Sequence, residues 1–175
     1  MKRLLLIATL LLGCTSTRGV WHRNDHDVLE AALSDQYLTQ LLVDPTATIL
    51  LPNASAPAID QTSGQPYFFA LSDRSEKQLA PFREQLRSRN MTARPLPPHL
   101  ASPLPISGCA AIQGRSDVRQ FVWVSMPAYA KTGNRAAVAV VLHLNKPCCG
   151  SGYIALLSKT ASGWRVDDHT AEWIE

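Results

Sequence analysis

Apolar residues in the first half of the chain recur at intervals of three and four positions, which is the spacing of an amphipathic helix. The first such segment begins at Asn24 or Asp25, either of which can cap a helix, and it must end by Asp44 because Pro45 follows. Its apolar positions are Val28, Leu29, Ala32, Leu33, Tyr37, Leu38 and Leu41. Residues 46–51 are expected to form a short strand after this helix.

A second helix is predicted after a surface loop at residues 52–66 and a short strand at residues 67–71. Ser75 and Gln78 have the spacing of a capping box, and Pro81 either kinks this helix or lies in its first turn. The positions expected on one face are Leu79, Phe82, Leu86 and Asn90. Residues 95–105 contain five prolines, so an extended crossover bounded by Leu96, Leu100 and Leu104 is expected there.

The pattern changes in the second half, where three runs rich in β-branched and aromatic residues follow one another at residues 119–126, 136–144 and 153–166. Short connections such as Thr132-Gly133-Asn134 and Ser162-Gly163 favour an antiparallel meander. The run at 136–144 is apolar on both faces and is therefore expected to be the central strand. The predicted class is α+β, with an antiparallel β-meander sheet in the C-terminal half and the two N-terminal helices packed on one face.

The N-terminus has the pattern of a secretory signal: Lys2-Arg3 precedes an apolar run at residues 4–12 that is too short to span a bilayer. The run ends in Leu11-Leu12-Gly13-Cys14, which resembles the lipobox of bacterial lipoproteins. That resemblance implies lipidation of Cys14 and cleavage before it, whereas the alternative is an ordinary signal peptide with an incidental cysteine. The expected division is a signal peptide at 1–13, a lipidated tether at 14–23 and one domain at 24–175.

The resemblance also implies a location. An aspartate directly after the lipidated cysteine retains enterobacterial lipoproteins at the inner membrane, and this chain has Thr15 there. We therefore expect a lipid anchor in the outer membrane, with the domain facing the periplasm. Several acyl chains on Cys14 would make that tether stable, because a single chain anchors only marginally.

Loss of the leader changes the charge and the cysteine count. Removing Lys2 and Arg3 lowers Lys+Arg from 17 to 15 against 14 acidic residues, a net charge near +1 that gives no electrostatic case for nucleic-acid binding. The remaining cysteines are Cys109, Cys148 and Cys149, and an oxidising compartment favours one disulfide with one thiol left over. Cys109 could pair with Cys148 or Cys149, and a vicinal Cys148–Cys149 bridge is the third option.

A second resemblance covers about the last 60 residues. The pattern is carried by Ser125-Met126-Pro127-Ala128-Tyr129, Ala136-Ala137-Val138, Cys149-Gly150-Ser151-Gly152-Tyr153, Leu157-Ser158-Lys159, Gly163-Trp164-Arg165-Val166 and Trp173-Ile174. It is similar to a group of small, uncharacterised bacterial envelope lipoproteins for which no activity is known. The resemblance therefore supports the fold and names no function. The two cysteines before Gly150 depart from the pattern and suggest a local disulfide.

Four of the histidines are candidates for chemistry. His22 and His26 have the i, i+4 spacing of metal ligands, with Asp25 and Asp27 nearby, although a solvated helix cap is the favoured explanation. His143 lies in the apolar strand, where a core or edge role is the simpler interpretation. His169 follows Asp167-Asp168, and a carboxylate can orient an imidazole for catalysis.

Sequence motifs for a catalytic nucleophile or for a phosphate-binding loop are weak in this chain. The chain contains neither the G-x-S-x-G nor the S-x-x-K motif of serine hydrolases. Ser125 is the only serine in the pattern shared with the envelope lipoproteins, and its hydroxyl could equally form a hydrogen bond with the backbone. Gly150-Ser151-Gly152 is better explained by a bulge or a close strand approach than by a phosphate cradle. Aromatic residues concentrate in the sheet half and could form a binding platform or cover the core: Trp123, Tyr129, Tyr153, Trp164 and Trp173.

These observations favour a non-catalytic, envelope-anchored lipoprotein that binds a protein or another envelope component. A sharper version is a periplasmic immunity or inhibitor protein acting against a toxin or a lysozyme-like enzyme. The alternatives are a small envelope hydrolase using His169 or His143 with Ser125, and a structural assembly factor. The expected partners are the membrane, through the lipid, and an envelope protein; no residue is assigned to catalysis, a cofactor or a metal.

Overall fold

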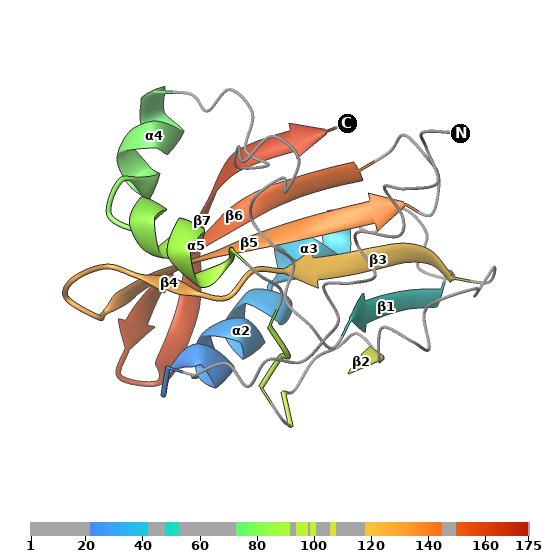
Figure 1. The fold of residues 1–175 in the computed structure, drawn as a ribbon, viewed down its shortest axis with the longest axis horizontal. Helices are drawn as coiled ribbons and strands as arrows, with labels where there is room; N and C mark the ends of the chain where they lie inside the picture. Colours follow the sequence, from blue (N-terminus) through green and yellow to red (C-terminus); the bar gives the residue numbers. More distant parts are fainter. Residues whose placement is uncertain are drawn as a thin grey trace.

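A computed structural model describes residues 22–41, 48–52, 73–91, 94–97, 99–100, 106–107, 118–144 and 150–174. These residues form one mixed sheet with helices on both of its faces (Figure 1). The helices are α2 (Asp25–Leu33), α3 (Gln36–Leu41), α4 (Asp73–Leu79) and α5 (Arg83–Arg89). The strands are β1 (Thr48–Pro52), β2 (Ile106–Ser107), β3 (Val118–Val124), β4 (Ala128–Tyr129), β5 (Arg135–Leu144), β6 (Gly150–Thr160) and β7 (Gly163–Ile174).

The C-terminal half is antiparallel, as the sequence predicts. Strands β3, β5, β6 and β7 are neighbours in that order, and short β4 pairs with β5 beyond the end of β3. The long apolar strand β5 lies inside the sheet between β3 and β6. The α+β class with an antiparallel C-terminal sheet is thus confirmed. The sheet then continues through β1 and β2, which run parallel to their neighbours.

The helices cover opposite faces of this sheet, which differs from the expected packing on one face. Helix α2 packs on Val138 and Val140 of β5, whereas α4 and α5 pack on Ala137 and Ala139. Successive residues of a strand point to opposite faces, so these two sets lie on the two sides of β5. The physical reason is the apolarity of β5 and β6 on both faces, which requires a covering layer on each side.

Each predicted helix is broken into two. The first ends at Leu33, and Asp35 starts α3 as its N-cap: the Tyr37 N–H donates to Asp35 Oδ1 at 3.3 Å. The second breaks between Leu79 and Arg83 around Pro81, which confirms the expected interruption at this proline. All four residues predicted on one face of that helix are buried: Leu79, Phe82, Leu86 and Asn90.

The predicted capping box at Ser75 and Gln78 is wrong, because α4 already begins at Asp73. Both side chains instead reach the sheet. The Thr170 hydroxyl donates to Ser75 Oγ at 2.8 Å and lies 2.9 Å from Gln78 Oε1, and Gln78 Nε2 donates to Asp168 Oδ2 at 2.8 Å. These polar side chains therefore attach α4 to β7.

Several sequence predictions fall partly or wholly outside the described residues. The predicted strand at 46–51 is observed as β1, and Leu96 and Leu100 of the crossover are buried. Two predicted segments lie outside the described residues: the loop at 52–66, apart from its first residue, and the strand at 67–71. The same holds for Leu104 and for all four cysteines, Cys14, Cys109, Cys148 and Cys149. Within the described part of the chain, no helix has the length and apolarity needed to cross a membrane.

Candidate functional site

The strongest cluster of chemically capable side chains lies on the α2–α3 face of the sheet, around His169 of β7. An irregularity in the pairing of β6 with β7 shifts the register between Leu156 and Leu157, so that Leu157 pairs with Val166 and Ala155 pairs with His169. Val166 and His169 consequently both lie on the α2–α3 face, while Asp168 points to the α4 side. We call Asp35, Tyr37, Tyr153 and His169 the carboxylate–histidine cluster.

The carboxylate partner of His169 is Asp35. His169 Nε2 and Asp35 Oδ2 are hydrogen-bonded, although the two residues are 134 positions apart in the chain. The His169 side chain is 22% exposed and that of Asp35 is 14% exposed, so the pair is mostly shielded and still reached by water. The sequence correctly indicated a carboxylate beside His169 but named the wrong ones, Asp167 and Asp168.

Two tyrosines hold the His169 ring. Tyr37 stacks on it with ring centroids 4.2 Å apart and an angle of 23°, and Tyr153 meets it edge-on at 5.2 Å. Tyr153 is fully buried, and its burial, with the charge of Asp35, raises the pKa of its hydroxyl above the ordinary value. Among the described residues its hydroxyl has no hydrogen-bond partner, which is unusual for a buried polar atom.

The pair of Asp35 and His169 has the chemistry of a general acid–base unit, in which the carboxylate fixes the imidazole orientation. A nucleophilic mechanism also needs a hydroxyl or thiol within about 3 Å of the imidazole. Within the described part of the chain no such group is hydrogen-bonded to His169. The cluster can therefore move a proton or bind a polar group, and its described residues by themselves do not make up a catalytic triad.

Ser125 does not supply the missing hydroxyl. The Ser125 backbone bonds to Ala139 on β5. Ala139 pairs with Ile154 on β6, and Ile154 pairs with Thr170, the neighbour of His169 on β7. Three strand spacings therefore separate Ser125 from the His169 region, a distance of roughly 14 Å across the sheet. The Ser125 hydroxyl instead accepts the Ala139 N–H at 2.9 Å. The backbone-bonding role weighed from the sequence is the one observed.

His143 does not meet Ser125 either. It pairs with Phe121 on β3, four residues along β5 from Ala139, or roughly 13 Å from the Ser125 position. The side chain of His143 is outside the described set. The alternative that combines Ser125 with His143 or His169 is therefore contradicted by the strand register.

A second polar junction, which the sequence did not reveal, joins α2, α5 and β4. Arg89 of α5 donates to both carboxylate oxygens of Asp25, at 3.0 and 2.6 Å, and the Tyr129 hydroxyl donates to Asp25 Oδ1 at 2.9 Å. Asp25 is only 1% exposed. Arg89 also donates to the Pro127 carbonyl and lies 5.6 Å from the centre of the Tyr129 ring. We call Asp25, Arg89 and Tyr129 the arginine clamp.

Among the described residues, the two histidines near α2 contact different groups and do not share a ligand. The His22 N–H donates to Asp25 Oδ2 at 2.8 Å, and its ring lies 4.4 Å from that of Tyr129. His26 instead contacts the His99 carbonyl, Asp27 and Glu30; burial lowers its pKa, but the carbonyl and the two carboxylates outweigh that effect and raise the pKa above its usual value. No group of three or more ligands for a metal ion occurs among the described residues.

The aromatic residues do not share one face. Tyr129, Tyr153 and Trp164 belong to the core on the α2–α3 side, whereas Trp123 alternates with core residues Val122 and Val124 and so points to the other side. The side chain of Trp173 is outside the described set. A platform built from all five residues is therefore contradicted, and three of them cover the core instead.

The glycines of Gly150-Ser151-Gly152 lie in the first part of β6. Gly152 pairs with Val141 and with Trp173, and the pairing with β7 becomes irregular directly after it. This agrees with the expectation of a bulge or close strand approach. Two acidic residues of β7 accept hydrogen bonds from neighbouring side chains: Asp168 from Gln78, and Asp167 from Arg165 at 2.9 Å.

Comparisons with known proteins add no family to this description: no family model, curated protein or solved structure matches the chain at a significant level.

Proposed function

We propose that this chain is an exported lipoprotein, held in the outer membrane through lipidated Cys14, whose domain binds a protein or another envelope component without catalysing a reaction. The observation that carries the proposal is the Leu11-Leu12-Gly13-Cys14 motif directly after a short apolar leader. The first described helix begins at Asp25, so few residues of the sequence separate Cys14 from the described domain. A segment of this length could link the lipid on Cys14 to the domain.

The bonding of the polar side chains supports a binding role. Several polar groups of the described residues are engaged in contacts within the domain: Asp25 with Arg89, Asp168 with Gln78, and the Ser125 hydroxyl with the Ala139 N–H. Interactions of this kind fix one arrangement of helices on the sheet. A rigid domain of this kind presents its surface with little loss of conformational freedom on binding.

The anchor is tested by expressing the full chain and its Cys14→Ala variant in bacteria, followed by membrane fractionation and mass spectrometry of the N-terminal peptide. The natural chain is expected in the outer-membrane fraction, with acyl chains on Cys14 and no residues before it. The variant should lose both properties. Cys109→Ala is the matched control and should retain both. A natural chain that is unmodified and soluble in the periplasm would overturn the anchor.

The binding role is tested by crosslinking and affinity capture of the tagged, lipidated protein from its own envelope. One partner in a fixed ratio is the expected result, and a toxin or a lysozyme-like enzyme in that position would select the immunity or inhibitor version. His169→Gln should capture the same partner to within about twofold, because the His169 side chain is only 22% exposed and offers little surface to a partner. Absence of any stoichiometric partner contradicts the binding role.

The hydrogen bond between His169 and Asp35 favours one second candidate, an envelope hydrolase whose nucleophile lies outside the described residues. Hydrolysis of simple esters and amides by the natural chain is compared with that by His169→Gln and by His26→Gln, the matched control on α2. Our main proposal expects equal, background rates for all three. A rate that falls about a hundredfold only in His169→Gln would favour the hydrolase.

A further inference from the structure

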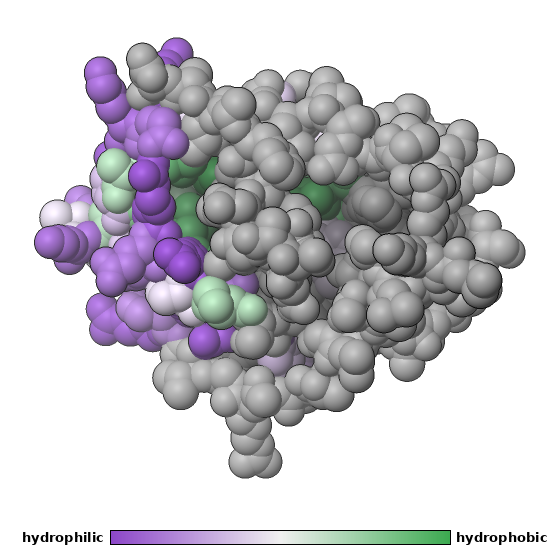
Figure 2. Space-filling model, turned by 45° about the horizontal axis from the view of Figure 1, so that its top comes forward, coloured by the Kyte–Doolittle hydropathy of each residue, from purple (hydrophilic) through white to green (hydrophobic). Residues whose placement is uncertain are grey.

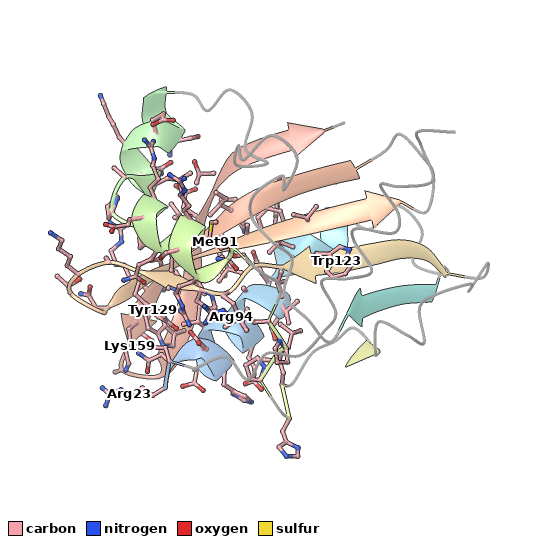
Figure 3. All side chains as sticks on the ribbon, viewed as in Figure 1. Arg23, Met91, Arg94, Trp123, Tyr129 and Lys159 are labelled. Atoms are coloured by element: carbon pink, nitrogen blue, oxygen red, sulfur yellow. The ribbon has the colours of Figure 1, made fainter. Side chains whose placement is uncertain are left out.

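The end of the domain that the tether enters lies beside two turns of the sheet. The ring of His22, directly before Arg23, lies 4.4 Å from the Tyr129 ring, which in turn lies 6.1 Å from Trp164. Trp164 pairs with Lys159 across β6 and β7. Arg23 and Lys159 consequently occupy the same end of the molecule, as Figure 3 shows together with Tyr129.

The turn between β4 and β5 lies at this end too. The Lys159 N–H donates to the Asn134 carbonyl at 2.8 Å, which fixes this turn next to the turn between β6 and β7. Lys131 lies in the same turn as Asn134. We call Arg23, Lys131 and Lys159 the tether-end cations.

These cations are exposed, and no acidic partner for them occurs among the described residues. The acidic groups at this end already have cationic or histidine partners: Asp25 with Arg89, Asp27 with His26, and Asp167 with Arg165. Figure 2 shows a mostly hydrophilic surface on the described part of the domain visible in that view. The tether end therefore carries a local excess of positive charge, although the mature chain as a whole is nearly neutral.

The short tether holds this end close to the membrane. Arg23 follows Cys14 by nine positions, a segment that spans at most about 30 Å when extended. That reach exceeds the Debye length of about 8 Å in physiological salt. The cations therefore feel a charged surface strongly only when the domain rests on it.

We propose that the tether-end cations dock the domain directly on anionic lipid headgroups, which fixes its orientation on the membrane and turns the opposite end toward the periplasm. The inference rests on the lipid anchor proposed above. Phosphate-bearing headgroups are the partner chosen because the lipid on Cys14 would bring this end of the domain to such a surface. Attraction of basic side chains to an anionic leaflet is general and does not require a built pocket.

The test uses the mature, lipidated protein in vesicles of neutral lipid alone or of neutral and anionic lipid mixed. A water-soluble amine-reactive reagent labels lysines, and mass spectrometry compares Lys131 and Lys159 with Lys77, an exposed residue of α4 that serves as internal control. Labelling of Lys131 and Lys159 should fall about fivefold on the anionic vesicles. Labelling of Lys77 should not change, and about 1 M salt should abolish the difference because it shortens the Debye length to about 3 Å.

A charge-matched pair of variants isolates the proposed surface. The double variant Arg23→Gln and Lys131→Gln should lose most of the protection of Lys159, whereas Lys77→Gln with Arg87→Gln removes equal charge from α4 and α5 and should keep it. Equal labelling on both kinds of vesicle would overturn the docking. So would protection by inorganic phosphate without vesicles. A chain that fails to bind neutral vesicles would instead overturn the lipid anchor, so the two failures are distinguishable.

Discussion

Asp25 and Asp35 are both shielded carboxylates of the same N-terminal helical segment, yet their surroundings differ. Asp25 is 1% exposed and is held by a guanidinium, a phenol and a backbone N–H. Asp35 is 14% exposed and shares one imidazole, while its other oxygen caps α3. The arginine clamp holds a permanent ion pair, since arginine does not lose its proton in proteins, whereas histidine can. The arginine clamp is therefore suited to holding the helices in place, and the pair of Asp35 and His169 is suited to exchanging a proton or a ligand.

The largest expected effect comes from removing the carboxylate of the clamp. Asp25→Ala leaves the Arg89 cation largely buried without its partner, and we expect a loss of about 3–5 kcal/mol in the free energy of unfolding, measured with urea. Asp27→Ala is the control on the same helix, because Asp27 is 65% exposed, and it should cost less than about 0.5 kcal/mol. Equal losses in both variants would show that the clamp does not stabilise the domain.

The two buried tyrosines provide the next contrast. Tyr129→Phe removes a hydrogen bond to the Asp25 carboxylate and should destabilise the domain by about 1.5–3 kcal/mol. Tyr153→Phe removes a buried hydroxyl that has no partner among the described residues, so it should be neutral or stabilising. The measurement is again urea unfolding at neutral pH. A larger loss in Tyr153→Phe than in Tyr129→Phe would reverse the assignment of these two roles.

Alkaline pH should weaken the fold through the same tyrosines. Burial, followed by the charges of Asp25 and Asp35 respectively, raises the pKa of Tyr129 and Tyr153 in the folded state. A raised pKa means that stability is fully present below the unfolded value of about 10 and is lost as the pH rises above it. At pH 11 the loss is about 1.4 kcal/mol for each tyrosine.

Urea unfolding and phenolate absorbance, followed together from neutral to alkaline pH, check this expectation. The chain has 4 tyrosines, and Tyr129 and Tyr153 should ionise only as the protein unfolds. The double variant Tyr129→Phe and Tyr153→Phe should show a flatter dependence on pH. Ionisation of all tyrosines near pH 10 in a protein that is still folded would contradict the assignment.

The smallest effect is expected at Asp35. Asp35→Ala removes both the cap of α3 and the partner of His169, and should cost about 1–2 kcal/mol. Asp35→Asn retains the cap and should cost less than half as much. Urea unfolding of both variants separates capping from pairing with His169. If the two variants lose equal stability, the hydrogen bond to His169 and not the cap provides the stabilisation.

The periodicity of apolar residues predicted most of the sheet and one helix face correctly. β5 and β6 were recognised because apolar runs bounded by turn residues leave few alternatives. Leu79, Phe82, Leu86 and Asn90 were placed on one face even though Pro81 interrupts the helix. The break at Ser34 and Asp35 was missed because the three- and four-residue spacing continues through it, and only the capping bond of Asp35 reveals it.

The candidate site was less predictable, because its residues are far apart in the sequence and come together only in the folded domain. His169 was singled out by its acidic neighbours, but Asp167 and Asp168 face other groups and the partner is Asp35, 134 positions away. The clamp joins Asp25 to Arg89 and Tyr129 over 64 and 104 positions. The helix layers were placed wrongly because apolarity on both faces of a strand does not show which helix covers which face.

The position of α2 has a consequence for the order in which the domain is assembled. This helix is the first described element to leave the ribosome, and it packs on β5, β6 and β7, which are the last. A chain synthesised from its N-terminus therefore presents α2 before the strands that α2 packs against have been made. The helix must wait as an unprotected amphipathic segment until the C-terminal hairpin has formed. The same long sequence separations predict slow folding, because the entropy of closing large loops is lost before the stabilising contacts form.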